Sequence, residues 1–266
     1  MNVLGLIAGH VVLAVAAQPI AASTPPSADA SAQETAKLAE EDRFDKRLEA
    51  VDAAMAKVVD LRADFEQRRH TPLLKKPLVS KGTVLTKGER VRWDTATPRA
   101  STLLIEGGLI RLFYPSDRLV EEYPAGDGFK DLAGAPLPRL SVLRERFEVS
   151  QIAARELVAS EGNSMLLAIR LTPKTDALKL HVTAVKVLID ESRPAATKVV
   201  MIDPDGEETE IVFSNVKLNE GVRDDEMELK LPEGVRVSRP LGDLDAAPAR
   251  QEGTSATEPA AGGEQP

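Results

Sequence analysis

The pattern of apolar and polar residues has a helical period near the start of the chain and a period of two in most of the remaining sequence. Within residues 34–63, Leu48, Val51, Met55 and Val58 recur at spacings of three and four, which places them on one face of a helix. Charged residues fill many of the other positions. The pattern therefore predicts a helix over 34–63 that lies on an apolar surface.

Short segments of alternating apolar and polar residues follow Asp64. Turn residues separate them about every ten positions, which is typical of an antiparallel meander. Residues 129–147 instead have apolar residues at roughly helical spacing, and they predict one or two short helices inserted into the sheet. The predicted strands are residues 83–86, 90–94, 102–105, 109–114, 165–171, 179–190, 198–203, 208–216 and 235–237.

A long sheet with one apolar face must curl or be covered. The alternation assigns one set of apolar side chains to a single face and predicts that they line a cavity. Aromatic residues make up only 3% of the chain, so mostly aliphatic side chains would form a deformable lining suited to alkyl chains. On pattern alone, the alternative is a half-barrel plugged by helices with nothing bound. The predicted lining is Val91, Trp93, Ile110, Leu112, Met165, Leu167, Ile169, Val185, Val187, Ile211 and Phe213.

The two ends of the chain differ in composition from its body. Residues 1–22 begin with an apolar run too short for a comfortable membrane span, and they predict a secretory signal peptide, with an uncleaved anchor as the alternative. Residues 23–33 are predicted to be a flexible linker. Residues 242–266, rich in Ala, Pro, Gly and Glu, are predicted to be a disordered tail. Residues 34–241 are then predicted to form one domain.

Charge and residue types argue against several classes of function. The chain has 42 acidic and 34 basic residues, a net charge of −8 that does not favour a nucleic-acid partner. It has no Cys and therefore no thiol nucleophile. His70 and His181 have no metal-ligand spacing around them, and His10 belongs to the predicted signal peptide. The glycine of Asp203-Pro204-Asp205-Gly206 comes too early for a calcium loop, which indicates a tight turn. We expect no enzyme activity, cofactor or metal site.

A series of short motifs runs through most of the chain. It comprises Phe65-Glu66-Gln67, Gly82-Thr83-Val84, Arg92-Trp93-Asp94 with Pro98, Glu106-Gly107 with Tyr114-Pro115, Leu171-Thr172-Pro173-Lys174, the turn at Asp203 to Gly206, and Pro232-Glu233-Gly234-Val235-Arg236-Val237. The order and spacing of these motifs resemble those of the LolA family, periplasmic carriers that move acylated lipoproteins between membranes. The resemblance covers most of residues 45–240.

The resemblance implies a mainly β fold with α-helices, in which an unclosed antiparallel β-barrel, or half-barrel, is covered by lid helices that enclose an apolar cavity. In that family an Arg-Pro pair precedes the strand that carries Trp, and its Arg holds the lid shut. Here the equivalent stretch is Lys87-Gly88-Glu89, which leaves Arg90 as the candidate lid clamp. The candidate lid residues are Leu48, Val51, Met55, Leu140 and Leu143.

The function implied by the resemblance is that of a soluble, monomeric periplasmic carrier. It would bind the acyl chains of lipoproteins or of another acylated lipid and shuttle them from the inner to the outer membrane. The implied partners are an inner-membrane ATP-driven release complex and an outer-membrane receptor. One alternative is a lipid- or lipoprotein-sensing regulatory module of the same fold. Another is an envelope structural protein with a filled core and no extractable ligand.

Overall fold

The computed structural model describes residues 28–125, 139–158 and 165–241. The chain divides into two compact units, residues 1–45 and 46–266, and helix α1 (Ala28–Met55) contributes residues to both. The described part of the first unit is the beginning of α1, where the side chains of residues 33–43 are exposed. The predicted signal peptide, the first part of the predicted linker and the predicted tail lie outside the described residues.

Helix α1 begins at Ala28, earlier than the sequence pattern predicted. It also ends earlier, at Met55, because a strand already begins at Asp60. The spacing of Leu48, Val51, Met55 and Val58 continues to Leu61, which made the helix look longer. From Leu61 onward, however, the chain is paired on both sides within a sheet, and this tertiary pairing overrides the local pattern.

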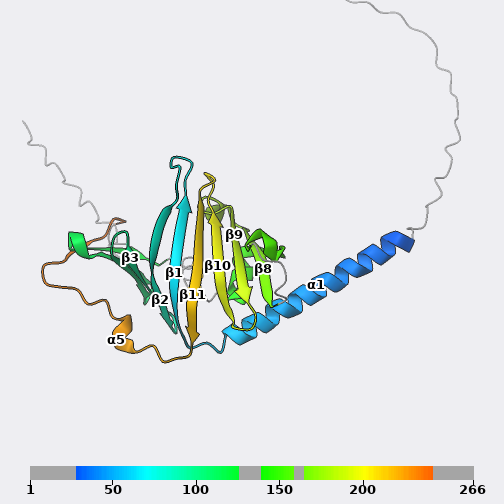
Figure 1. Cartoon of the computed structure of the whole chain (residues 1–266), viewed down its shortest axis with the longest axis horizontal. Coiled ribbons are helices and arrows are strands. Elements are labelled where there is room, and N and C mark those ends of the chain that lie inside the picture. Colours follow the sequence, from blue (N-terminus) through cyan, green and yellow to red (C-terminus); the bar gives the residue numbers. More distant parts are fainter. Residues whose placement is uncertain (1–27, 126–138, 159–164, 242–266) are drawn as a thin grey trace, which may run out of the picture. The chain divides into compact units, whose positions relative to one another are not determined.

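In the described part of the chain, twelve strands form one sheet. Their bounds are β1 (Asp60–His70), β2 (Leu78–Lys87), β3 (Arg90–Thr97), β4 (Ser101–Glu106), β5 (Leu109–Tyr114), β6 (Leu119–Pro124), β7 (Phe147–Gln151), β8 (Leu166–Pro173), β9 (Ala184–Asp190), β10 (Ala195–Ile202), β11 (Glu208–Leu218) and β12 (Arg236–Ser238). The strand order is β12-β6-β5-β4-β3-β2-β1-β11-β10-β9-β8-β7 (Figure 1). The order does not close on itself, so β12 and β7 are free edges and the sheet is an unclosed half-barrel.

The sheet consists of two antiparallel meanders that are joined where β1 pairs with β11. The predicted meander is thereby confirmed, except that β12 pairs with β6 in parallel. The sequence pattern missed β1, β6 and β7. Two of these are short, and β6 contains adjacent glutamates, so their alternation is weak. The strand predicted over 179–190 begins only at Ala184, because the short helix α4 (Asp176–Lys179) precedes it.

Short helices connect or cover the strands. They are α3 (Leu140–Arg146), α4, α5 (Asp224–Met227) and two 3-10 turns, η1 (Pro115–Asp117) and η2 (Ala154–Glu156). Helix α3 confirms part of the helical insertion predicted over 129–147, and residues 129–138 of that insertion lie outside the described residues. Among the described residues, no helix is both long and apolar enough to cross a membrane.

The Asp203 to Gly206 segment forms the tight turn that the sequence predicted. The side-chain Oδ1 of Asp203 accepts hydrogen bonds from the backbone N–H groups of Asp205 and Glu207, at 3.1 and 2.8 Å. Gly206 has a φ of 78°, a left-handed conformation that glycine adopts without steric cost. The carboxylate at this position therefore holds the turn that joins β10 to β11.

Gly82 allows β2 and β3 to approach closely. A Cβ atom at this position would lie 1.9 Å from the backbone oxygen of Asp94 and 2.9 Å from the Phe65 ring. The register of the two strands also shifts between Lys81 and Gly82. The glycine is therefore required where the ring of Phe65 packs over this bulge.

Candidate functional site

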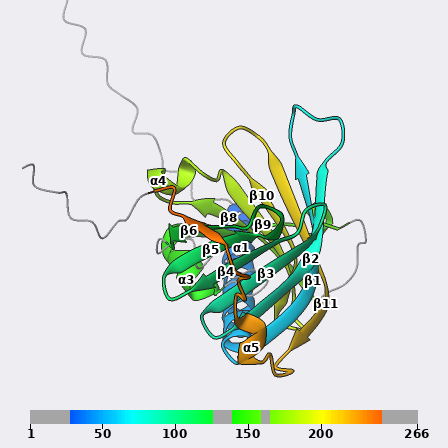
Figure 2. The ribbon, with the colours of Figure 1, turned by 90° about the vertical axis from the view of Figure 1, so that its left-hand side faces the viewer.

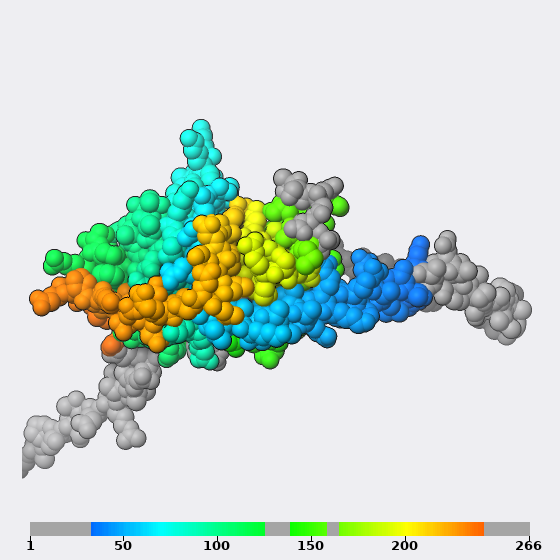
Figure 3. Space-filling view, turned by 60° about the horizontal axis from the view of Figure 1, so that its bottom comes forward, coloured from blue at the N-terminus to red at the C-terminus, as the bar shows by residue number. Residues whose placement is uncertain are grey.

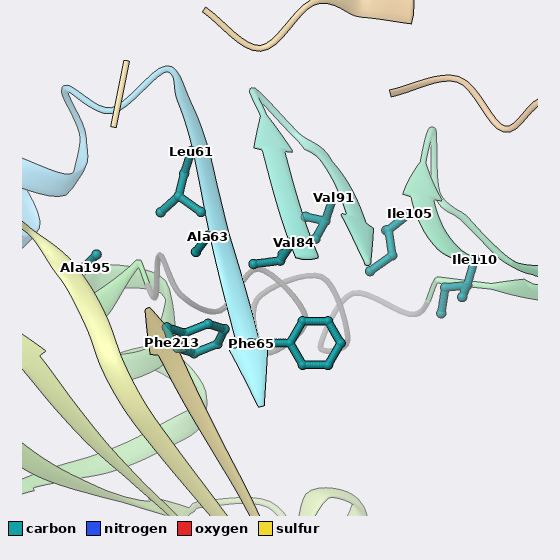
Figure 4. Packing of buried hydrophobic residues seen from close by; sticks show 9 residues of the cluster. All are labelled: Leu61, Ala63, Phe65, Val84, Val91, Ile105, Ile110, Ala195 and Phe213. Carbon is teal, nitrogen blue, oxygen red and sulfur yellow. The ribbon is translucent and has the colours of Figure 1, made fainter. Parts of the chain in front are cut away.

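One face of the sheet, which we call the inner face, carries a continuous apolar surface. Cross-strand register aligns Leu61 of β1 with Val91 of β3 and Ile105 of β4 through Thr86 of β2. Nine buried side chains form one cluster on this face, each 8% exposed or less (Figure 4). The members of this inner cluster are Leu61, Ala63, Phe65, Val84, Val91, Ile105, Ile110, Ala195 and Phe213.

The single tryptophan is part of the same surface. Trp93 is half-buried against the inner cluster, and its ring centroid lies 4.9 Å from that of Phe65 and 5.9 Å from that of Phe213. The Phe65 contact is edge-to-face, with an interplanar angle of 67°. Because three strands contribute these rings, Trp93 fluorescence will report on any ligand that separates them.

The inner face continues across the second meander. Register pairs Ile169 with Val187, Val187 with Val199, and Val199 with Ile211, so these side chains lie on one face. Val199 and Ile211 pack against the inner cluster, which joins the two meanders into one surface. The residues of β8 and β9 on this face are 0–2% exposed; they are Leu167, Ile169, Leu171, Val185, Val187 and Ile189.

The structure brings most of the predicted lining residues together. Val91, Ile110 and Phe213 belong to the inner cluster, and Trp93 and Ile211 pack against it. Leu167, Ile169, Val185 and Val187 are buried on the same face of the second meander. Leu112 is half-buried and pairs with Leu103, which also contacts the cluster. Met165 differs, because it precedes β8 and is 45% exposed.

The sequence prediction missed several residues of the surface. Leu61 and Ala63 were overlooked because the predicted helix ran to residue 63, and Phe65 was overlooked because the prediction had no strand between residues 64 and 82. Their alternation with Arg62, Asp64 and Glu66 is the signal that could have identified them. The other missed members are Val84, Ile105 and Ala195.

The nine side chains of the inner cluster are buried. One cavity of about 70 Å³ touches the inner cluster at Ala195 and Phe213. Sites for small ligands typically enclose roughly 300–1,000 Å³. An alkyl chain of a lipid therefore does not fit in this cavity unless neighbouring side chains or a covering segment move.

Two helices carry the candidate lid residues. Leu48, Val51 and Met55 lie on one face of α1 and are 1–5% exposed, and Leu140 and Leu143 of α3 are each 2% exposed. The helices are connected by Asp52, whose Oδ1 accepts hydrogen bonds from the backbone N–H groups of Leu140 and Ser141, at 2.9 and 3.4 Å. A carboxylate of α1 thus caps the N-terminus of α3.

A second polar contact fastens α1 to the sheet. Arg47 donates from Nε and Nη2 to the two carboxylate oxygens of Glu191, at 3.1 and 2.7 Å. Its Nη2 also donates to the backbone oxygen of Leu166, at 3.1 Å. Leu166 begins β8 and Glu191 follows β9, so Arg47 holds the end of α1 at this edge of the inner face.

Arg90, the residue predicted as lid clamp, has other partners. It forms ion pairs with Asp224 of α5 and, at 3.7 Å, with Glu106. The hydrogen bond from Arg90, together with one from Lys87, lowers the pKa of Asp224 below its ordinary value. The partners of Arg90 therefore place it with the C-terminal segment, and it is Arg47 that ties α1 to the sheet.

The opposite, outer face of the first meander is covered by the C-terminal segment, residues 219–241. Val222 and Met227 bury Leu85 of β2 on this face. Arg62 donates to Glu226 at 2.6 Å, and Arg239 donates to Glu122 at 3.1 Å. In Figure 2 this segment (orange) passes in front of β3–β6, and the end of α1 (blue) lies behind them.

The inner face offers a ligand apolar contact rather than polar chemistry. Within the described residues, no buried side-chain nitrogen or oxygen lacks a hydrogen-bond partner. The same residues contain no group of three or more His, Cys, Asp or Glu that could hold a metal ion. These features define a mainly β protein whose unclosed sheet has an apolar inner face beneath helices.

A family model described as "Outer membrane lipoprotein carrier protein LolA" matches residues 56–230. The chain therefore belongs to the LolA family. The match spans β1 to the residues just before β12 and so includes nearly the whole sheet. A comparison with curated proteins gave no match.

Several solved structures are similar to this chain. An uncharacterized conserved protein from Thermus thermophilus is 11% identical, with a TM-score of 0.44 over 73% of this chain and 98% of its own. A chain of the MucA/MucB complex from Pseudomonas aeruginosa is 11% identical, with a TM-score of 0.40 over 71% of this chain and 61% of its own. A putative outer membrane lipoprotein-sorting protein domain from Vibrio parahaemolyticus is 12% identical, with a TM-score of 0.39 over 69% and 97%.

Proposed function

We propose that this protein is a periplasmic carrier that binds the acyl chains of lipoproteins, or of another acylated lipid, on its inner face. The observation that carries the proposal is the continuous apolar surface from β5 to β8 beneath α1 and α3. The family match supports an acylated cargo, because the family is named for lipoprotein carriers. The residues proposed to line the bound state are those of the inner cluster, together with Trp93, Leu112, Leu167, Ile169, Val185, Val187 and Ile211.

A closed lid would lower the net affinity of a carrier for acyl chains, so that the cargo can be released. Burying an alkyl chain contributes roughly 0.8 kcal/mol per CH₂, or on the order of 12 kcal/mol for sixteen carbons before any costs. A cargo with two or three such chains would not be released from an open apolar face. If the chains must first displace Leu48, Val51 and Leu140, exposing these lid side chains offsets part of that gain. The carrier then binds tightly enough to transport and weakly enough to release.

We propose that loading and unloading depend on partners. The chain has no phosphate-binding loop and so no energy source of its own. Family resemblance supports an inner-membrane ATP-driven complex that loads a monomeric carrier and an outer-membrane receptor that accepts the cargo. A lipoprotein-sensing regulator of the same fold would bind acylated ligand but would not pass it to an acceptor, so a transfer assay between membranes distinguishes the two functions.

The experiment that tests binding uses Trp93 as the reporter. The lipid-stripped protein is titrated with one lipoprotein in its acylated and unacylated forms while Trp93 fluorescence is recorded. We expect a saturable change with the acylated form alone. Ile211→Asn, on the inner face, should weaken this response, whereas Val212→Asn, on the next residue of β11 and the other face, should preserve it. A folded protein that responds to no acylated ligand contradicts the proposal.

A further inference from the structure

The hairpin that joins β1 to β2 carries a group of exposed apolar side chains away from the inner face. Leu73, Leu74, Leu78 and Val79 are 89%, 49%, 55% and 38% exposed. They lie within seven consecutive residues, whereas a soluble surface normally carries such side chains singly. No role in the inner face explains them.

The tip of this hairpin projects beyond the strands beside it. Pairing of β1 with β11 ends at His70, and pairing of β1 with β2 ends where Arg69 meets Leu78. Residues 71–77 therefore extend past both ladders, and the hairpin (cyan) protrudes from the surface in Figures 1 and 3. The tip has a defined turn, because Thr71 accepts hydrogen bonds from the backbone N–H groups of Leu74 and Leu73, at 3.1 and 3.4 Å.

The charge of the hairpin is opposite to that of the whole chain. Residues 66–81 contain five Lys and Arg and one Glu, a formal charge of +4 in a chain of net charge −8. Arg68, Arg69 and Lys81 are paired with Glu66, Glu207 or Glu210. Lys75 and Lys76 follow the exposed leucines directly and make no ion pair with a described residue. The unpaired positive charge is thus concentrated at the projecting end.

We propose that the β1–β2 hairpin tip docks this protein on the surface of an anionic phospholipid bilayer. Leu73 and Leu74 would enter the interface between headgroups and acyl chains, and Lys75 and Lys76 would contact lipid phosphates. A protein partner fits less well, because a stable protein interface buries about 800 Å² on each side and a seven-residue tip is too small to supply it. The acidic turn at Asp203 to Gly206 lies in the neighbouring β10–β11 hairpin. An anionic bilayer repels it, so only the tip of the β1–β2 hairpin would contact the membrane.

The docking is expected to be weak and reversible. Each lysine near an anionic surface contributes a factor of about five in partitioning. Two lysines and two leucines therefore hold the protein at a membrane long enough to meet a partner there and still let it leave. Docking by the hairpin tip does not require a ligand on the inner face, so it can be tested independently of the proposed function.

The test is sedimentation of the lipid-stripped protein with vesicles of phosphatidylcholine, with or without phosphatidylglycerol. We expect the protein to sediment with the anionic vesicles and to be released by salt. Leu73→Ser/Leu74→Ser should lower partitioning by at least about tenfold, and Lys75→Ser/Lys76→Ser by about 25-fold. Leu180→Ser is the matched control, because Leu180 is 75% exposed on another part of the surface. It should sediment like the unmodified protein.

Four results would overturn the proposal. The first is that the unmodified protein does not sediment with vesicles, and the second is that it sediments equally with both vesicle types. The third is that the tip variants sediment as much as the unmodified protein does. The fourth is that the unmodified protein does not bind vesicles but a tip variant no longer transfers ligand to a protein acceptor, which would indicate a protein partner. Far-UV circular dichroism confirms that each variant is folded. The Trp93 response to acylated ligand should persist in the tip variants, and Ile211→Asn should still sediment, so failure of either proposal is visible separately.

Discussion

The two faces of the sheet are both covered by other parts of the same chain, but the covers are fastened in different ways. The C-terminal segment on the outer face is held by strand pairing between β12 and β6 and by a series of ion pairs. The cover at the inner face, α1 and α3, presents buried apolar side chains, with polar links through Arg47 and Asp52.

Because the two covers are fastened differently, we expect a lipid to be able to replace only one of them. Apolar contacts are non-directional, so an alkyl chain can substitute for Leu48 or Leu143 against the inner face with little net loss. It cannot substitute for a backbone ladder or for the bond between Arg62 and Glu226. We therefore expect a bound lipid to displace the inner cover and to leave the outer cover in place.

The largest expected effect contrasts two buried side chains, one in each cover. Leu48→Ala on α1 and Met227→Ala on α5 remove residues that are each 1% exposed. Each should lower the free energy of unfolding by about 2–5 kcal/mol, measured by urea denaturation. Only Leu48→Ala should tighten binding of an acylated ligand, because the closed state that competes with the ligand is weakened. Equal changes in affinity for both variants contradict the distinction between the covers.

A smaller effect is expected at the polar fastening of α1. Arg47→Gln removes the bonds to Glu191 and to the Leu166 carbonyl, which should destabilise the closed arrangement by about 1–3 kcal/mol. Uptake of acylated ligand, followed by stopped-flow Trp93 fluorescence, should become faster. Arg90→Gln serves as the control, because Arg90 pairs with Asp224 of the outer cover. If Arg90→Gln accelerates uptake as much as Arg47→Gln does, the assignment of the fastening is wrong.

The smallest expected effect is on the stability of the protein at acidic pH. Hydrogen bonds from Arg90 and Lys87 lower the pKa of Asp224 below its ordinary value of 3.8. The contribution of ionised Asp224 to the free energy of unfolding is therefore complete above pH 3.8. It is lost as the pH falls through the lower pKa that Asp224 has in the folded state. Thermal unfolding across this range should be less pH-dependent in Asp224→Asn than in the unmodified protein. Ligand binding at neutral pH should be unchanged in the variant, because we do not expect the outer cover to open.

The sequence predicted the inner face well where alternation alone decided it. Val91, Ile110 and Phe213 could be assigned because a strand places every second side chain on one face. Leu61 could not, because its spacing from Val58 also fits a helix, and only pairing with distant strands decides between the two.

The fastenings of the two covers could not be predicted in the same way. Arg47 and its partner Glu191 are 144 positions apart, and nothing local separates Arg47 from the other charged residues of α1. Leu85 is buried on the outer face only because Val222 and Met227 return to cover it. A local pattern shows which residues share a face, but it does not show which later segment will cover that face.

The most direct test of the central claim is hydrogen–deuterium exchange measured with and without an acylated ligand. The displaceable-lid account predicts faster exchange for the amides of residues 46–55 in α1 and for α3 when ligand is bound. Exchange in α5 and β12 should stay the same. Unchanged exchange in α1 and α3 at saturating ligand, or equal changes in both covers, would contradict the claim that the inner cover alone makes way for lipid.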